Sequence, residues 1–524
     1  MIDWTDLNSA ETLVGAVALI CDGGASDKSA AVDFVFHCTV PPHRLSDQQK
    51  TAVKTIAAGV LENPQSWVDA LPVCIMLSSV VGKYADRLYG CYGLRKAFYS
   101  TNDRVTRNQL LFTLNSLCFK YGVDMGFELI DMYFAHYDDW FRFIRPQPFE
   151  PIPGRCLIMV PQFLSPPHAP TVDTVAKYGI LRDKWGYDVA ILNSAERPAQ
   201  IDLPVLEMSP TGRMPDYGGF QNVTGPFAIQ GLKMFTPSHA MPSFEGYIAC
   251  LSFIEQWRPE FILNYGGFHM IGECAAQSVK MITMPAGTEL LPTRTSEYDV
   301  VFHKAGELER NLIERFAMDK VKVIEAVYNY DMPAQTETYS RADFGLLADD
   351  FAVAVVGNRL ETEIDADNIA LLGRVAAIDP RIHLVFAGSL SDDAREHIVS
   401  GIPKAQVKFA GVVKDVPAFY EHVDAYVNPK RMGGGSSAAF ALGKGLPTFT
   451  LNRGHVADLT HPDFVFDTPE DLLAAIAAAL DPAALAALRD KARQGFERIG
   501  SRERMIETIL TAADVKPHKA LETA

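Results

Sequence analysis

Residues Asn428–Leu459 read NPKRMGGGSSAAFALGKGLPTFTLNRGHVADL, which places a glycine-rich turn between two apolar runs. Val423–Val427, just before it, is a short run of strand type, and Ala438–Leu442 favours a helix. Glycines let the backbone turn sharply and approach a ligand closely, while serines cap helices. Because the free N–H groups of a helix N-terminus attract anions, this strand-to-helix junction predicts a phosphate-binding turn.

The predicted contributors to this turn are two cations and the glycine and serine residues that follow them. GGGSS is neither the dinucleotide-binding fingerprint nor the P-loop, so the glycines alone leave a turn without a ligand as an equal alternative. The contributors are Lys430, Arg431, Gly433, Gly434, Gly435, Ser436 and Ser437.

Composition bounds the classes of protein to consider. A chain of 524 residues is long enough for about three domains, and its 48% apolar residues are ordinary for a globular protein. The formal net charge of −16 argues against nucleic-acid binding, which depends on neutralising phosphates with lysine and arginine. The expected partner is a small molecule, a sugar or a protein.

The eight cysteines are scattered without a CxxC pair, and no histidines cluster at metal-ligand spacing, so we predict reduced cysteines and no metal site. The N-terminus is acidic and lacks the pattern of a secretory signal. Apolar stretches such as Leu71–Val81 are too short to span a membrane. These features predict a cytoplasmic protein.

Residues 1–145 are predicted to form an all-α domain, with helices near residues 47–61, 107–119 and 127–143. Strand-type alternation is rare there apart from Val32–Val40. The aromatic run Tyr133–Phe143 favours a packed core or an interface onto the next domain over an acceptor-binding face. Four prolines at positions 146, 148, 151 and 153 then mark residues 146–154 as a linker.

From residue 155 onward, buried strand-type runs alternate with helix-type runs, which predicts βαβ units and parallel sheets. We expect two tandem doubly wound (Rossmann-like) α/β domains at residues 155–340 and 345–497, followed by a C-terminal helix and tail at 498–524. Ligands of such sheets bind at the carboxyl ends of the strands. The expected strands are residues 156–160, 187–192, 261–265, 280–284, 298–303, 352–356, 383–387, 407–411, 425–427 and 446–451.

The stretch from Asn428 resembles the donor-binding signature of GT-B glycosyltransferases that use nucleotide sugars. The resemblance lies in Asn428-Pro429, the glycine and serine turn, Ala441-Leu442, Gly445-Leu446-Pro447 and Thr450. It covers roughly residues 155–510, with a bacterial-type, group-1-like donor domain on the C-terminal side. It implies that the two α/β domains stand in the GT-B arrangement. The family usually has a glutamate where this chain has Phe440, so the retaining or inverting outcome of the transfer stays open. We interpret Phe440 itself as a core residue.

The resemblance implies a metal-independent glycosyltransferase of hexosyl or N-acetylhexosaminyl type. Its donor would be a nucleotide sugar, UDP-linked by expectation, with no further cofactor, and its acceptor a protein or glycan. Arg359, in Gly357-Asn358-Arg359-Leu360, matches an arginine that reaches the donor diphosphate in the family, and His455 lies toward the donor side. The Asp349-Asp350 and Asp392-Asp393 pairs fall in apparent surface segments.

Three residues of the first α/β domain are catalytic candidates. His269 follows a buried strand and a Gly266-Gly267 pair, and Glu273 lies one helical turn later, so the two could act together as a general base and its partner. His168 stands in the loop after the first strand. A helix-capping histidine and an unremarkable loop histidine are the structural alternatives.

Two other functions stay open. The missing glutamate also fits a non-catalytic GT-B-like partner subunit, and a sugar-nucleotide epimerase would use the same fold without an acceptor. The helical domain, joined by a stiff linker, is expected to dock beside the acceptor side of the cleft or to form homo-oligomers.

Overall fold

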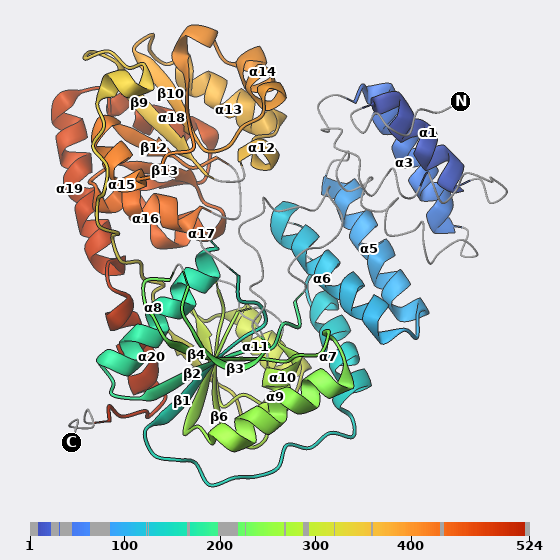
Figure 1. Cartoon of the computed structure of the whole chain (residues 1–524). Helices are drawn as coiled ribbons and strands as arrows, with labels where there is room; N and C mark the ends of the chain where they lie inside the picture. The colour runs from blue at the N-terminus through green and yellow to red at the C-terminus, as the bar shows by residue number, and fades with distance from the viewer. Residues whose placement is uncertain are drawn as a thin grey trace.

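The computed structural model describes the chain in three parts, a set of N-terminal helices and two α/β domains (Figure 1). The described residues are 9–21, 31, 45–62, 84–121, 123, 125–164, 168–197, 218–225, 227–266, 269–286, 293–318, 320–357, 360–429 and 434–518.

The N-terminal part is helical, as the apolar spacing predicts. α1 and α3 pack against each other, and α5, α6 and α7 form a second group. The predicted runs at residues 32–40 and 71–81 lie outside the described residues. The helices are α1 (Ala10–Cys21), α3 (Asp47–Glu62), α5 (Tyr84–Ser100), α6 (Arg104–Tyr121) and α7 (Glu128–Phe141).

Helix α7 joins this part to the first α/β domain through a shared apolar core. Phe141 packs edge to face on Tyr247 of α9 (Phe244–Trp257), with ring centroids 4.7 Å apart, and Trp140 lies 5.2 Å from the same ring. One cluster of buried side chains includes residues of α7, α9 and α10 (Met270–Ala275). The packed-interface interpretation of the aromatic run is therefore confirmed.

The first α/β domain has an eight-stranded sheet in the order β3-β4-β2-β1-β5-β6-β7-β8. All neighbouring strands are parallel except β3 and β4. Helices α8 (Ala169–Asp183), α9, α10 and α11 (Glu307–Arg315) connect them. The strands are β1 (Arg155–Val160), β2 (Asp188–Asn193), β3 (Gly219–Val223), β4 (Leu232–Thr236), β5 (Phe261–Tyr265), β6 (Lys280–Met284), β7 (Tyr298–Val301) and β8 (Lys322–Glu325).

The second α/β domain has a six-stranded, fully parallel sheet in the order β11-β10-β9-β12-β13-β14. Its strands are β9 (Phe351–Val356), β10 (Ile382–Ala387), β11 (Val407–Gly411), β12 (Ala425–Val427), β13 (Thr448–Leu451) and β14 (Val465–Phe466). Its helices are α12 (Leu360–Glu363), α13 (Ala366–Ala376), α14 (Asp392–Gly401), α15 (Val416–Phe419), α16 (Gly435–Gly443) and α17 (Gly454–Leu459), with 3-10 turns at Arg341–Phe344, Lys404–Gln406, Tyr420–His422 and Pro462–Phe464.

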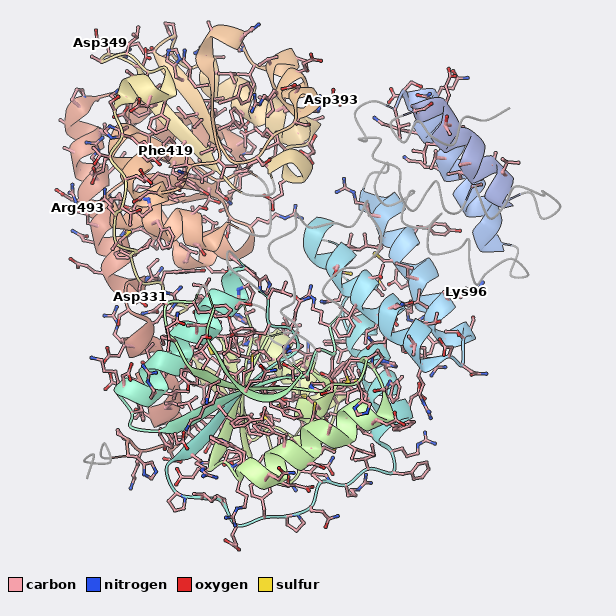
Figure 2. The ribbon with its side chains drawn as sticks, viewed as in Figure 1. Lys96, Asp331, Asp349, Asp393, Phe419 and Arg493 are labelled. Carbon is pink, nitrogen blue, oxygen red and sulfur yellow. The ribbon has the colours of Figure 1, made fainter. Side chains whose placement is uncertain are left out.

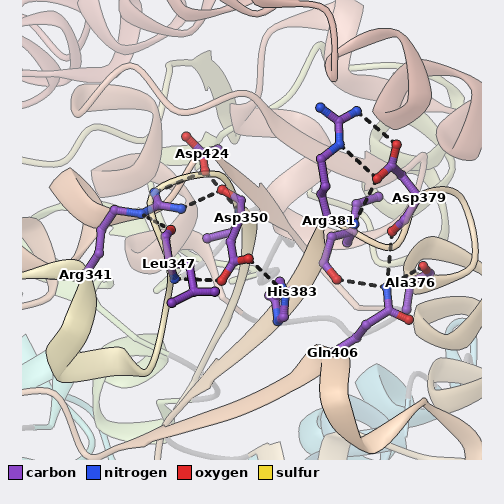
Figure 3. Close-up of polar contacts among 11 residues, drawn as sticks. Arg341, Leu347, Asp350, Ala376, Asp379, Arg381, His383, Gln406 and Asp424 are labelled. Atoms are coloured by element: carbon purple, nitrogen blue, oxygen red, sulfur yellow. Dashed lines mark hydrogen bonds and ion pairs between the residues drawn. The ribbon is translucent and has the colours of Figure 1, made fainter.

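Polar contacts at the amino ends of these strands hold the connecting segments (Figure 3). Arg341 pairs with Asp424, just before β12, at 3.3 Å, and His383 pairs with Asp350, just before β9, at 3.1 Å. Gln406 donates to the carbonyls of Ala376, Asp379 and Ile382. Asp350 is thus engaged in a structural contact at the end of the sheet where α/β ligands do not bind.

The chain ends in three helices, α18 (Pro469–Ala478), α19 (Pro482–Ile499) and α20 (Arg502–Ala512), and Pro482 begins α19 as predicted. Helix α20 leaves the second domain and packs on α8, where Met505, Ile506, Ile509 and Leu510 enter the core of the first domain. No one helix of the described chain has both the length and the apolarity to cross a membrane; α18 and α19 pass that test only as a pair, bent by 114°.

Candidate active site

The glycine turn of the second domain lies at the junction that the sequence predicts. β12 ends at Val427, and α16 begins at Gly435 with Gly434 as its N-cap. Gly434 has φ +99°, a backbone conformation that residues other than glycine rarely adopt. Lys430, Arg431 and Gly433, and also Arg359 after β9, lie outside the described residues, so their predicted roles stay predictions.

The first turn of α16 is closely packed. A β-carbon added at Gly435 would overlap the Tyr330 hydroxyl, and the carbonyl of Ser437 accepts a hydrogen bond from Tyr420 at 3.0 Å. Ser436 and Ser437 are half-buried, and the first turn contains no acidic residue. The partial positive charge at the N-terminus of α16 is therefore not offset by a carboxylate in the first turn of the helix.

Helix α17 packs beside α16 and carries His455 in its first turn. In Figure 1, α16 and α17 lie on the side of the second domain that faces the first. Phe440 packs half-buried against the core of the second domain, which confirms the core interpretation of that side chain.

His168 is the N-cap residue of α8, after β1. Its Nδ1 lies 2.8 Å from the Thr171 hydroxyl, and burial lowers its pKa to about 4, with Arg197 adding to the effect. The side chain is therefore a neutral imidazole that contacts Thr171 and makes no capping hydrogen bond to the backbone of α8, and its catalytic role stays a prediction.

His269 is the N-cap residue of α10 and is 1% exposed. Its Nδ1 lies 2.7 Å from Asn264 Oδ1, and its Nε2 lies 2.7 Å from Ser194 Oγ. The Asn264 amide donates to Thr283 at 3.3 Å, so its oxygen faces the ring and Nδ1 carries the proton. Burial lowers the pKa of His269 to about 3. Its unprotonated Nε2 thus accepts a hydrogen bond from the Ser194 hydroxyl.

Glu196 contacts both Ser194 and His269. One carboxyl oxygen accepts the backbone N–H of Ile271, in the first turn of α10, at 2.9 Å. The other lies 3.3 Å from both Ser194 Oγ and His269 Nε2. Burial raises the pKa of Glu196 to about 8, so the carboxyl is protonated at neutral pH and can donate to Ser194.

The same network continues across the sheet to β6 and β7, where Thr283 and Asp299 are paired in register. Thr283, at the end of β6, is reached by Thr293 at 3.2 Å, and Thr293 donates to Asp299 of β7 at 2.8 Å. Burial raises the pKa of Asp299 to about 8. Glu196 and Asp299 are thus two protonated carboxyls at the ends of one buried chain of hydrogen bonds that includes His269.

Glu273 is not part of this network and points toward Arg294. Its side chain is fully buried, one oxygen lies 3.4 Å from Arg294 Nε, and within the described chain no donor reaches the other oxygen. Burial raises the pKa of Glu273 to about 7, although Arg294 opposes the shift. Within the described contacts, His269 therefore pairs with Glu196 rather than with Glu273, and neither side chain faces solvent in this conformation.

Sequence reasoning missed Ser194 and Glu196. Both follow β2 directly, at the same edge of the sheet as His269, so the rule that sites form where parallel strands end would have pointed to them. Within the described residues, no group of three or more histidine, cysteine or acidic side chains is arranged to hold a metal ion.

Comparisons with known proteins agree with this architecture. The sequence profile of the family described as Glycosyl transferases group 1 matches residues 352–482. A mutant O-GlcNAc transferase of Thermobaculum terrenum superposes with a TM-score of 0.54 at 13% identity, covering 96% of each chain. No curated protein sequence matches this chain significantly.

Two further solved structures are more distant. TarM has a TM-score of 0.45 at 10% identity and covers 69% of this chain and 99% of its own. The pneumococcal O-GlcNAc transferase GtfA, solved with UDP and GlcNAc, has a TM-score of 0.42 at 11% identity and covers 69% and 98%.

The likeness to the Thermobaculum protein shows the fold: two tandem doubly wound domains in the GT-B arrangement, preceded by a helical region. The profile match begins in β9 and ends at the start of α19, so it covers the second sheet and the glycine turn. Residues 352–482 of this chain are therefore a glycosyl transferase group 1 domain.

Proposed function

We propose that this protein is a metal-independent glycosyltransferase that moves a sugar from a nucleotide-diphosphate donor, UDP-linked, to a protein or glycan acceptor. The observation that carries the proposal is the start of α16, where Gly434 and Gly435 open a helix N-terminus inside the group 1 domain. Charge grows on the diphosphate as the sugar leaves, so N–H groups already in place there would lower the barrier.

The proposal assigns the donor side to the second domain. Gly433, Gly434, Gly435, Ser436 and Ser437 would hold the diphosphate through backbone N–H and hydroxyl groups. Arg359, Lys430, Arg431 and His455 would add charge or donors around it.

The proposal assigns the acceptor side to the first domain. A carboxyl whose pKa is raised to about 7 can exchange a proton near neutral pH, whereas burial in this conformation makes His269 a weaker base than an ordinary histidine. His269 and Glu273 are the proposed groups, and His168, at the start of α8, is a third candidate. Because the Ser194 hydroxyl is hydrogen-bonded to Nε2 of His269, a hydroxyl of the sugar acceptor would have to replace Ser194 at this nitrogen.

The cytoplasmic location is part of the same proposal. Cys91, Cys156, Cys250 and Cys274 carry free thiols, which fits a reducing compartment.

The experiment that tests the proposal is calorimetry of the full chain with UDP, GDP and a set of their sugar conjugates. We expect UDP to bind with a Kd between about 1 μM and 1 mM, in the range of ordinary enzyme substrates. Gly434→Val should abolish this binding, because a β-carbon would block the turn and strain the positive φ. Gly411→Val is the matched control, since Gly411 also has a positive φ but lies at the end of the edge strand β11.

The outcomes separate the alternatives. Equal UDP affinity in the two folded variants would remove the turn from the site. A wild-type chain that binds none of the nucleotides would favour a non-catalytic partner subunit, the function that Phe440 in place of an acidic residue also fits. Turnover that chelator abolishes and manganese or magnesium restores would contradict metal independence.

A further inference from the structure

The chain crosses between the two α/β domains twice, and the two crossing segments are bonded to each other. The first runs from β8 toward β9, and the second joins α19 to α20. Asn329 Nδ2 donates to the Ser501 carbonyl at 2.8 Å, and the Tyr330 N–H donates to the Ile499 carbonyl at 2.7 Å. Figure 2 shows Asp331, in the first segment, at the junction of the two domains.

One carboxylate of the first domain holds both crossing segments. Asp173 on α8 is 3% exposed, and it accepts a hydrogen bond from Tyr328 of the first segment at 2.9 Å. Its other oxygen accepts from Arg502 Nε, at the start of α20, at 2.8 Å. Arg502 also pairs with Asp331 at 3.2 Å, which closes the contact between the segments.

Lys177, one helical turn after Asp173, completes the cluster. Its fully buried ammonium pairs with Asp173 and lies 3.9 Å from the centroid of the Tyr265 ring. Burial alone would raise the pKa of Asp173, but Lys177 and Arg502 lower it to about 2, so the residue is a carboxylate at neutral pH. A buried ion pair of this kind is weak evidence for stability, and its best-attested use is to select one geometry.

Tyr330 connects this cluster to the proposed donor site. Its ring packs on Tyr328 with centroids 5.1 Å apart and belongs to the core of the second domain. Its hydroxyl occupies the space where Gly435 would carry a side chain. A shift of the first crossing segment would therefore displace the first turn of α16.

We propose that Asp173 is a positioning residue that sets the angle between the two α/β domains and, through Tyr328 and Tyr330, the place of the α16 N-terminus. The inference rests on the proposed function in one respect, that α16 binds the donor diphosphate. If the angle varies, only a fraction of the molecules can bind the donor, and the apparent affinity falls in proportion to that fraction.

The test releases the two crossing segments from Asp173 without leaving a buried charge alone. Tyr328→Phe keeps the ring but removes the hydroxyl, which donates to Asp173 and lies 3.2 Å from the Tyr265 hydroxyl. Arg502→Gln leaves Asp173 paired with Lys177, and Asp331, whose side chain is 51% exposed, stays solvated. Lys184→Gln is the matched control, because it removes a surface ion pair between the end of α8 and α20 that does not involve Asp173.

Hydrogen exchange of the full chain without ligand is the first readout. In the double variant we expect amide exchange at residues 325–331, 499–505 and 434–443 to be about tenfold faster, as for a local opening that becomes easier. Exchange in β1 and β5 should not change. The Tyr328→Phe single variant should show a smaller effect in the same three segments, and it remains informative if the double variant does not fold.

UDP affinity by calorimetry is the second readout. We expect the double variant to bind UDP about tenfold more weakly, and Lys184→Gln to bind like the wild type. Unchanged exchange in the crossing segments would overturn the inference, and so would unchanged UDP affinity in a variant whose segments exchange faster. If wild-type protein binds no UDP, the proposed function fails, while the exchange data still decide whether Asp173 holds the crossings.

Discussion

At the scale of single residues, Glu196 predicts a dependence of stability on pH. Its pKa is about 8 in the folded protein because of burial, against an ordinary value of 4.5. Between these two values the folded state binds the proton that the unfolded state has released, so stability falls as pH rises from 4.5 to 8 and levels off above. Glu196→Gln keeps the hydrogen bonds of the neutral acid and should remove this loss.

The measurement is thermal or urea unfolding of both proteins from pH 5 to pH 9. We expect near-equal stability at pH 5 and an advantage of about 3 kcal/mol for Glu196→Gln at pH 8. Glu297→Gln, a change of the same kind at the surface, should follow the wild type at every pH. A constant difference between wild type and Glu196→Gln across this range would contradict a protonated Glu196.

Gly435 and Tyr330 predict a suppressor pair at the same scale. Gly435→Ala places a β-carbon against the Tyr330 hydroxyl and should cost about 1–3 kcal/mol of unfolding free energy, as overpacking does. Tyr330→Phe removes that hydroxyl, and the next ring atom would lie 3.4 Å away, an ordinary contact. The double variant should therefore recover most of the loss in a double-mutant cycle. If the two effects simply add, the two residues are not in contact in solution.

At the scale of elements, α7 predicts a sharp contrast between neighbouring phenylalanines. Phe141 is 1% exposed and stacks on Tyr137 at 5.1 Å, whereas Phe143 is 91% exposed. Phe141→Ala should lower the free energy of unfolding by about 3–5 kcal/mol, and Phe143→Ala should change it by less than about 0.5 kcal/mol. Equal effects in urea titrations would mean that α7 does not pack on α9 as described.

At the scale of the whole molecule, the shared core decides which N-terminal truncation is informative. Deleting residues 1–145 would expose the α9 and α10 surface that α7 covers, so we expect an aggregated or unfolded product. Deleting residues 1–83 removes α1 and α3 but keeps α5, α6 and α7.

The shorter deletion tests the role proposed for the helical region. We expect a folded protein that binds UDP like the full chain but transfers less sugar to its natural acceptor, or has lost its oligomeric state. Light scattering and a transfer assay distinguish the two. Equal transfer and an unchanged oligomeric state would assign neither role to residues 1–83.

The sequence by itself determined the parallel α/β architecture. Strands buried on both faces need continuous apolar runs, so β1, β2, β5, β6, β9 and β10 stand out without a structure. The edge strands β3 and β8, and β4 beside β3, are partly exposed and lack that run, which is why they were missed, together with the amphipathic α11. The start of α16 was also predictable, because backbone conformation there depends on consecutive glycines.

Only the tertiary structure decided which polar side chains meet. Ser194 and His269 are 75 residues apart, and Asp173 and Arg502 are 329 apart, and local patterns contain no information on such pairs. His269 and Glu273 have the helical spacing of a pair, yet one packs toward Glu196 and the other toward Arg294. The physical reason is that a buried polar group takes whichever partner the folded chain brings within hydrogen-bond distance, and that choice depends on how the strands, helices and crossing segments pack together.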